Sequence, residues 1–94
     1  MLQLTNSAAA ALADARSEIG LPDHYGLRVF RGYTDGKSAF QFGFVEKPEE
    51  GDEVGETHET RFFVAPEVAG PLADAVLDTE ETNQGRQLTL KPQS

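Results

Sequence analysis

The most regular alternation of apolar and polar positions lies in residues 26–45, with the sequence GLRVFRGYTDGKSAFQFGFV. In its second half, Phe40, Phe42 and Phe44 alternate with small or polar residues. A period of two places side chains alternately on the two faces of a strand, so the three rings share one face. This pattern predicts a strand whose aromatic face turns toward a core.

The first half of the same segment predicts a partner strand. Leu27 and Val29 repeat the alternation, and residues 34–36, Thr-Asp-Gly, separate the two halves. Asp-Gly readily adopts the positive φ angles of a tight hairpin turn. We predict a β-hairpin over residues 26–45 that forms the centre of the sheet.

An alanine-rich segment before the hairpin predicts a helix over residues 7–19. A short strand over residues 1–5 precedes it, and the side-chain oxygen of Thr5 or Asn6 caps the first helical turn. Gly20 ends the helix, because glycine adopts the left-handed C-terminal conformation at little cost. The predicted buried stripe, at spacings of four, three and four, consists of Ala8, Leu12, Ala15 and Ile19.

Acidic residues dominate residues 46–56, EKPEEGDEVGE, which also contain one proline and two glycines. Runs of like charge repel one another and stay hydrated, so this segment is predicted to be an exposed loop. An acidic loop can also bind a hard metal ion, but the alternation of oxygen ligands typical of calcium loops is absent. Residues 60–64 then predict a strand with Phe62 and Val64 on one face.

The C-terminal third is predicted to consist of short elements. A proline begins each of two helical turns, over residues 66–69 and 71–75. Residues 76–77 start another strand, residues 79–85 form a polar turn, and residues 88–90 form a last short strand. The side chains predicted to point inward from the two helical turns are Val68 and Leu72.

Composition limits the partners of this chain. Its 94 residues make one domain, 1–94, with a net charge of -8 from sixteen acidic and eight basic side chains. This charge opposes binding to nucleic acid or to an anionic membrane. The longest apolar run, residues 8–13, is too short to span a membrane, and no basic residue precedes it as in a secretory signal. We therefore expect a cytoplasmic protein.

The chain contains no cysteine, which excludes disulfides, thiolate metal sites and a cysteine nucleophile. Residues 32–38, GYTDGKS, have only three residues between their glycines and lead into a strand, so they do not meet the requirements of a phosphate-binding P-loop. The two histidines, His24 and His58, are too few for a typical zinc site and lie in no catalytic motif. We predict no catalytic residue, no bound metal and no cofactor.

Three residues near the hairpin turn are candidates for binding a protein partner: Arg31, Tyr33 and Lys37. The two cations stand in an otherwise acidic chain and suit an anion or an acidic partner, although hairpin ends commonly carry exposed charges that bind nothing. Tyr33 is assigned, with Phe30 and Phe63, to the face opposite the main apolar stripe. A sheet with apolar groups on both faces needs cover on both, so these rings cover a second layer, line a groove or contact a second copy in a homodimer.

The order of these elements resembles that of the A-type iron-sulfur carriers, the HesB/IscA family. Residues 2–11, LQLTNSAAAA, are similar to the family's first strand and Thr-x-Ser-Ala-Ala helix start, and residues 26–29 to its Gly-Leu-Arg-Leu strand. Residues 63–78, FVAPEVAGPLADAVLD, resemble its segment of valines, an Asp-Pro helix start, a Leu-Asp-Gly turn and an Ile-Asp pair. Residues 88–92, LTLKP, resemble its Phe-x-Phe-x-Asn-Pro strand. Together these stretches cover most of the chain.

The departures from the family pattern concern its chemistry. Members that carry clusters use a first cysteine in a Gly-Cys-Ser context and two more in a C-terminal Cys-Gly-Cys. Here residues 36–38, Gly-Lys-Ser, match the first motif with Lys37 in place of cysteine, and an ammonium group cannot replace a thiolate ligand. The C-terminal pair has no counterpart between Pro92 and Ser94. The chain thus resembles a cysteine-free member of the family, and no cluster-binding residue is carried over to it.

The resemblance implies a small α+β domain, a curved, mainly antiparallel β-sandwich with two helical segments packed on it. It also implies a non-enzymatic protein-binding module, accessory or regulatory to iron-sulfur cluster assembly, whose protein partner is unknown. Two alternatives stay open: an enzyme of unknown class, which the residues support least, and an iron-binding protein with oxygen and imidazole ligands. The ligands available for iron are Glu46, Glu49, Glu50, Asp52, Glu53 and His58.

Overall fold

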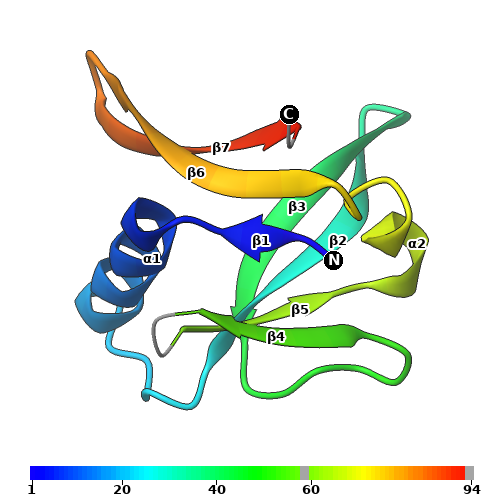
Figure 1. Cartoon of the computed structure of the whole chain (residues 1–94), viewed down its shortest axis with the longest axis horizontal. Coiled ribbons are helices and arrows are strands. Elements are labelled where there is room, and N and C mark those ends of the chain that lie inside the picture. The colour runs from blue at the N-terminus through cyan, green and yellow to red at the C-terminus, as the bar shows by residue number, and fades with distance from the viewer. Residues whose placement is uncertain (58–59, 93–94) are drawn as a thin grey trace.

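The computed structural model describes residues 1–57 and 60–92 and shows the expected α+β architecture of two packed sheets (Figure 1). The smaller sheet has the strand order β1 (Gln3–Leu4), β6 (Ala75–Thr82) and β7 (Gly85–Pro92). The larger sheet has the order β3 (Lys37–Val45), β2 (Gly26–Thr34), β5 (Thr60–Val64) and β4 (Glu53–Thr57). The helices are α1 (Asn6–Glu18) and α2 (Pro66–Ala69).

Antiparallel pairing predominates, as expected, because three pairs consist of strands that are consecutive in the chain. The antiparallel pairs are β2–β3, β4–β5 and β6–β7. The parallel pairs are β1–β6 and β2–β5, each of which joins segments far apart in the chain. Parallel neighbours need a long connection between them, so alternation within a strand does not reveal them. None of the helices in the described residues is long and apolar enough to cross a membrane.

The core lies between the two sheets and under α1. Its members are apolar side chains of the inner strands and of both helices, and the largest fully buried ones belong to Phe62, Leu2, Leu77, Val29, Val64 and Val68. Leu72, predicted to point inward with Val68, is buried as well. The predicted turn over 66–69 is confirmed as α2, and the next residues form turns up to Ala75, where β6 begins.

Helix α1 has the predicted caps, although it begins and ends one residue before the predicted bounds of 7–19. Thr5 is the N-cap, and its Oγ1 accepts a hydrogen bond of 3.1 Å from the backbone N–H of Ala8. Gly20, with φ of +78°, follows the helix in the left-handed conformation. The predicted stripe is wrong at one end, because Ile19 is 62% exposed and Ala9 is buried in its place. The helix packs mainly on β6, so its last turn extends past the core.

The cap residue also ties α1 to the smaller sheet. Thr5 Oγ1 donates a hydrogen bond of 2.8 Å to Asp78 Oδ1 on β6, and this bond together with that from the Thr79 N–H lowers the pKa of Asp78. We expect Thr5→Ala to lower the free energy of unfolding by about 1 kcal/mol, the usual cost of losing an N-cap. Thr5→Ser keeps the hydroxyl and should retain most of this stability in urea denaturation. Equal losses in the two variants would contradict the capping role.

The β2–β3 hairpin forms with the predicted turn, but it is not the centre of its sheet. Asp35 and Gly36 have φ angles of +53° and +77°, and Thr34 pairs with Lys37 across the turn. β2 is an interior strand, because β5 pairs with it on the other side, whereas β3 is an edge strand. A sequence shows that two strands pair with each other but not which of them has a second neighbour.

The aromatic stripe of β3 is therefore only partly covered. Phe44 packs against the core, but Phe40 and Phe42 are 39% and 38% exposed. The prediction that all three rings face a core is wrong for these two, because the apolar residues opposite the strand do not extend over its outer half. Their exposure leaves an apolar surface along the edge of the larger sheet.

The acidic segment 46–56 is a loop only in its first half. Its second half forms most of β4, an exposed edge strand whose Gly55 lies under the Phe62 ring of β5. Charged side chains are common on edge strands because they discourage pairing with other chains. The charge that predicts solvent exposure is thus compatible with a strand, and only the pairing with β5 distinguishes an exposed edge strand from an exposed loop.

The β6–β7 hairpin is longer than its sequence predicts. The polar residues 79–82 continue β6, and only Asn83 and Gln84 form the turn. The Thr82 hydroxyl stabilises this turn by donating to the Gly85 carbonyl over 2.7 Å and accepting from the Gln84 N–H. The strands extend past the core as a hydrogen-bonded ribbon, so their outer half shows no apolar alternation and resembles a loop in sequence.

Candidate functional site

The β2–β3 hairpin places two of the three residues predicted to bind a partner, Arg31 and Tyr33, on one face. Arg31 pairs with Phe40 across the hairpin, Tyr33 with Ser38 and Lys37 with Thr34. Tyr33 is 75% exposed, and Lys37 is exposed at the start of β3. We call the surface formed by Arg31, Tyr33, Ser38, Phe40 and Phe42 the hairpin surface. Lys37 borders it at the turn, because its pairing with Thr34 places it on the opposite face.

Arg31 is the ordered cation of the hairpin surface. Its guanidinium lies 6.0 Å from the centre of the Phe40 ring, within the range of a cation–π contact, and its backbone N–H donates to Glu67 Oε2 over 3.4 Å. The same side chain lines a shallow pocket of about 360 Å³ with Ser38, Ala39 and Phe40. This arrangement suits an apolar or aromatic group next to a carboxylate.

Tyr33 does not lie on the face opposite the main apolar stripe, where the sequence pattern predicts it. The continuous register of β2 places it on the face of Val29 and Arg31, whereas Phe30 lies on the opposite face with Phe63 of β5. The prediction from sequence is wrong for Tyr33, because Tyr33 follows Val29 and Arg31 at intervals of two residues and so shares the face of the apolar stripe. Tyr33 is thus an extension of the exposed aromatic stripe, beyond the end of the core.

The opposite face of the larger sheet is covered by the chain itself. The Arg61 guanidinium lies 5.3 Å from the Phe63 ring centre, and the Arg28 guanidinium lies 5.6 Å from that of Phe30. Phe63 is fully buried, and Phe30 is half-buried. Of the three open interpretations, a second covered layer fits Phe30 and Phe63, whereas Tyr33 is exposed on the other face.

Arg28 also fixes the acidic loop on this face. Its Nε donates to Asp52 Oδ2 over 2.9 Å and its Nη2 to Asp52 Oδ1 over 3.1 Å, and Glu49 Oε2 lies 3.4 Å from Nη1. The Asp52 side chain has no exposed area. Hydrogen bonding from Arg28 lowers the pKa of Asp52, and the same bond raises the pKa of Arg28. The loop is therefore anchored to the sheet at one end.

The carboxylates considered as iron ligands do not form a cluster. In the described parts of the chain, no three histidine or acidic side chains lie close enough to hold a metal ion. Asp52 forms an ion pair with Arg28, and Glu53 belongs to β4. Glu46 accepts a long hydrogen bond of 3.5 Å from the Tyr25 hydroxyl, and His58 lies outside the described residues.

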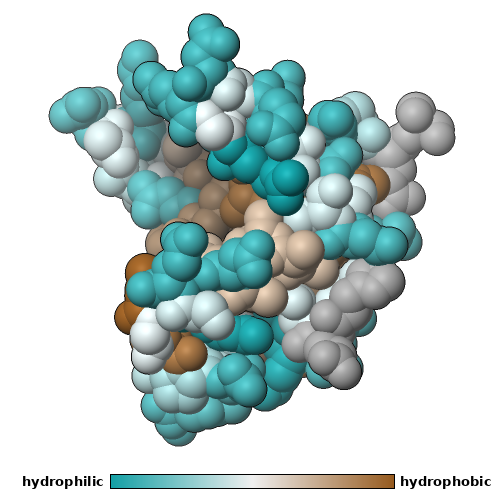
Figure 2. Space-filling model, turned by 90° about the vertical axis from the view of Figure 1, so that its left-hand side faces the viewer, coloured by the Kyte–Doolittle hydropathy of each residue, from teal (hydrophilic) through white to brown (hydrophobic). Residues whose placement is uncertain are grey.

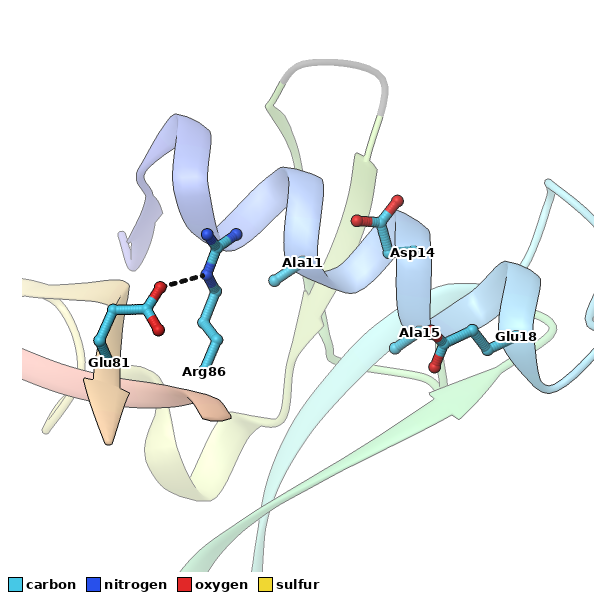
Figure 3. Close-up of a pocket in the computed structure, with 6 residues that line it drawn as sticks. All are labelled: Ala11, Asp14, Ala15, Glu18, Glu81 and Arg86. Carbon is cyan, nitrogen blue, oxygen red and sulfur yellow. Dashed lines mark hydrogen bonds and ion pairs between the residues drawn. The ribbon is translucent and has the colours of Figure 1, made fainter. Parts of the chain in front are cut away.

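A second hollow, which the sequence does not predict, lies between α1 and the β6–β7 hairpin. Figure 2 shows it below the hydrophilic end of that hairpin, with apolar atoms at its floor. In Figure 3, Arg86 extends from β7 toward the side of α1 that carries Ala11, and its Nε donates to Glu81 Oε1 over 3.3 Å. This groove of about 440 Å³ is lined by Ala11, Asp14, Ala15, Glu18, Glu81 and Arg86.

The sequence does not predict this groove, because its pattern predicts a turn over residues 79–85, which leaves α1 with no hairpin beside it. The available signal is the cross-strand pair of opposite charge at Glu81 and Arg86, which is typical of a hairpin extended in solvent. Asp14 and Glu18 on the helix are exposed. The groove is open and acidic, and no side chain in it is buried as an acid–base catalyst requires.

Comparison with known proteins identifies the fold. No family model and no curated protein matches the sequence. The crystal structure of IscA with the [2Fe-2S] cluster superposes with a TM-score of 0.84 at 19% identity, over 98% of this chain and 85% of that one. Escherichia coli SufA, involved in biosynthesis of iron-sulfur clusters, superposes with a TM-score of 0.77 at 17% identity, over 97% of this chain and 79% of SufA. The solution NMR structure of a protein from Aquifex aeolicus superposes with a TM-score of 0.73 at 21% identity, over 96% of this chain and 89% of that one.

These likenesses confirm the HesB/IscA-like fold that the sequence resemblance implies. They extend over nearly the whole chain, so the two sheets, α1 and the hairpins correspond as one unit. At these identities the comparison establishes the fold and not the activity. The activity has to be argued from the hairpin surface and from the chemistry of the residues it carries.

Proposed function

We propose that this protein is a cysteine-free, non-enzymatic relative of IscA and SufA that serves iron-sulfur cluster assembly through protein contacts and holds no cluster itself. The observation that carries this proposal is the IscA-like fold in a 94-residue sequence without cysteine. IscA was crystallised with a [2Fe-2S] cluster, and SufA is involved in the biosynthesis of iron-sulfur clusters. Because the fold is retained without cysteines to ligate a cluster, we favour a role that depends on contacts between protein surfaces.

The residues present do not fit an iron-sulfur cluster. Clusters are held mainly by thiolates, and the sequence has none. Lys37, at the position that the resemblance aligns with the first cysteine, is exposed and carries a positive charge that repels iron. No step of the proposed function therefore passes through a bound cluster.

The hairpin surface supports a protein partner in place of a cluster. It combines exposed aromatic rings with Arg31, and Lys37 borders it at the turn, on a chain of net charge -8. Aromatic and arginine side chains are the residue types most enriched at energetically important interface positions. The hairpin surface carries three residues of these types, Tyr33, Arg31 and Phe40. Arg31 and Phe40 line its pocket, and Tyr33 lies on the same strand pair.

Anaerobic reconstitution with iron and sulfide tests the absence of a cluster. We expect neither stoichiometric iron and sulfide nor a thiolate-to-iron charge-transfer band in the visible spectrum, whereas IscA treated in parallel should show both. Stoichiometric iron and sulfide in this protein would refute the proposal. Retained iron without the band would favour carboxylate and histidine ligands, and the acidic residues 46–53 would then be the first to replace.

Affinity capture with two charge-reversal variants tests the role of the hairpin surface. Lys37→Glu should weaken capture of the partner about ten-fold, the effect of losing roughly one charge pair at an interface. Lys47→Glu is the matched control, because Lys47 is also exposed but lies in the acidic loop. Captured proteins that include no component of iron-sulfur assembly, or equal capture by both variants, would contradict the proposal.

A further inference from the structure

The outer edge of β3 offers unpaired backbone groups. In the larger sheet β3 pairs with β2 alone, and no backbone hydrogen bond from another described element reaches residues 38–42. The side chains of Ser38, Ala39 and Phe40 are exposed, so this part of the strand is accessible. An exposed edge of this kind can pair with another strand.

The turn determines which backbone groups face outward. A two-residue hairpin loop closes on a pair that exchanges both hydrogen bonds, and here that pair is Thr34 and Lys37. Pairs then alternate, so Lys37, Ala39 and Gln41 direct their N–H and C=O groups toward β2. Ser38, Phe40 and Phe42 direct theirs away from the sheet.

The same three outward residues carry side chains on the hairpin surface. Ser38, Phe40 and Phe42 share the face of Arg31, so a strand added at this edge would place every second side chain beside two partly exposed rings. Main-chain hydrogen bonds would supply affinity, and the rings with the 360 Å³ pocket would select the side chains. Most natural edge strands are blocked by proline, a bulge or charge, and residues 38–42 contain no proline or charged side chain.

Charge indicates the kind of segment that fits. Lys37 is the first residue of β3, and Arg31 lies opposite Phe40 on β2, so an acidic side chain at the turn end of the added strand would be attracted. A second copy of this chain is disfavoured as the occupant, because it would bring a further net charge of -8 to the contact. The complementary partner is a protein segment with apolar alternation and an acidic end.

We infer that the β3 edge binds an extended segment of the partner protein as an added antiparallel strand, with an acidic residue at the C-terminal end of that segment beside Lys37. This inference rests on the proposed function and specifies how its partner is recognised. The juxtaposition of unpaired backbone, exposed rings and two cations over residues 31–42 carries it.

The probe for this inference is a synthetic nine-residue peptide of alternating valine and threonine with aspartate at its C-terminal end. At ten times its dissociation constant, the amide hydrogen exchange of Ser38, Phe40 and Phe42 should slow about ten-fold, because about one-eleventh of the sites stay free. Exchange at residues of the β6–β7 hairpin should not change. A peptide with aspartate moved to its N-terminal end should bind more weakly.

A proline variant separates backbone pairing from side-chain contact. Ser38→Pro removes one outward N–H at an edge position, where proline is tolerated, and should abolish the slowing of exchange at Phe40 and Phe42. Ser38→Ala keeps the N–H and should bind as the unmodified chain does. If Ser38→Pro fails to fold by circular dichroism, peptides methylated on the backbone nitrogens of one face or the other provide the same comparison.

Each outcome either supports or overturns the inference. Equal peptide binding by Ser38→Pro and Ser38→Ala would overturn it, and so would equal binding of the peptides with aspartate at the C-terminal and the N-terminal end. The proposed function would stay intact in either case if Lys37→Glu still lost its captured partner. Slow exchange that depends on protein concentration without peptide would identify a second copy as the occupant and also overturn it. Failure of the proposed function would appear separately, as stoichiometric cluster binding in the reconstitution.

Discussion

Replacing Phe62 by alanine is expected to lower the free energy of unfolding by about 3–5 kcal/mol, the usual cost of truncating a buried phenylalanine. Phe62 is only 2% exposed and lies between Leu27 of β2 and Gly55 of β4, its pairing partners on the two sides. The ring therefore joins three strands of the larger sheet to the core. Urea denaturation followed by circular dichroism measures this change.

A companion substitution shows whether the ring occupies the space over Gly55. A Cβ atom at position 55 would overlap the Phe62 ring, so Gly55→Ala should cost about 1–3 kcal/mol, as overpacked substitutions do. In the Phe62→Ala background this cost should disappear, which a double-mutant cycle detects. Gly70→Ala is the control, because nothing lies within 4 Å of a Cβ at that position and its φ is negative. Additive effects of the two core substitutions would contradict this packing.

Replacing Asp52 by asparagine is expected to lower the free energy of unfolding at pH 7 by about 3 kcal/mol, near the low end for a buried ion pair that loses one partner. The Asp52 side chain is fully covered and the Arg28 side chain is 13% exposed, so the guanidinium would lose its counter-ion where water cannot fully replace it. Glu49→Gln is the matched control. Glu49 is 71% exposed and should contribute less than about 1 kcal/mol.

The same pair makes stability depend on pH in acid. The pKa of Asp52 in the folded chain is lowered from its ordinary value of 3.8, so its stabilising effect is fully present above that value and is lost as the pH falls through the lowered pKa. Asp78 titrates in the same direction, so the informative quantity is the difference between the unmodified chain and Asp52→Asn. This difference should shrink below about pH 4. A difference that stays constant down to pH 2 would show that the ion pair does not stabilise the fold.

Much of the candidate site could be predicted because it depends on neighbours in sequence. The hairpin turn at Asp35 and Gly36 places Arg31 and Lys37 near one end, and the structure confirms this turn. The exposure of Phe40 and Phe42 could not be predicted, since it depends on how far the opposite sheet extends. The groove beside α1 could not be predicted either, because it needs the unexpectedly long β6–β7 hairpin.

The sequence by itself determined the local elements of this protein and the absence of thiolate chemistry. The capping Thr5, the left-handed Gly20 and the Asp-Gly turn act within a few residues of themselves, so their effects are readable without a fold. The tertiary structure alone decided that β3 is an edge, that β1 and β5 pair in parallel with β6 and β2, and that Asp52 is buried against Arg28. These features arise between segments distant in the chain, where pairing and burial depend on the free energy of the whole packed arrangement and no local pattern encodes them.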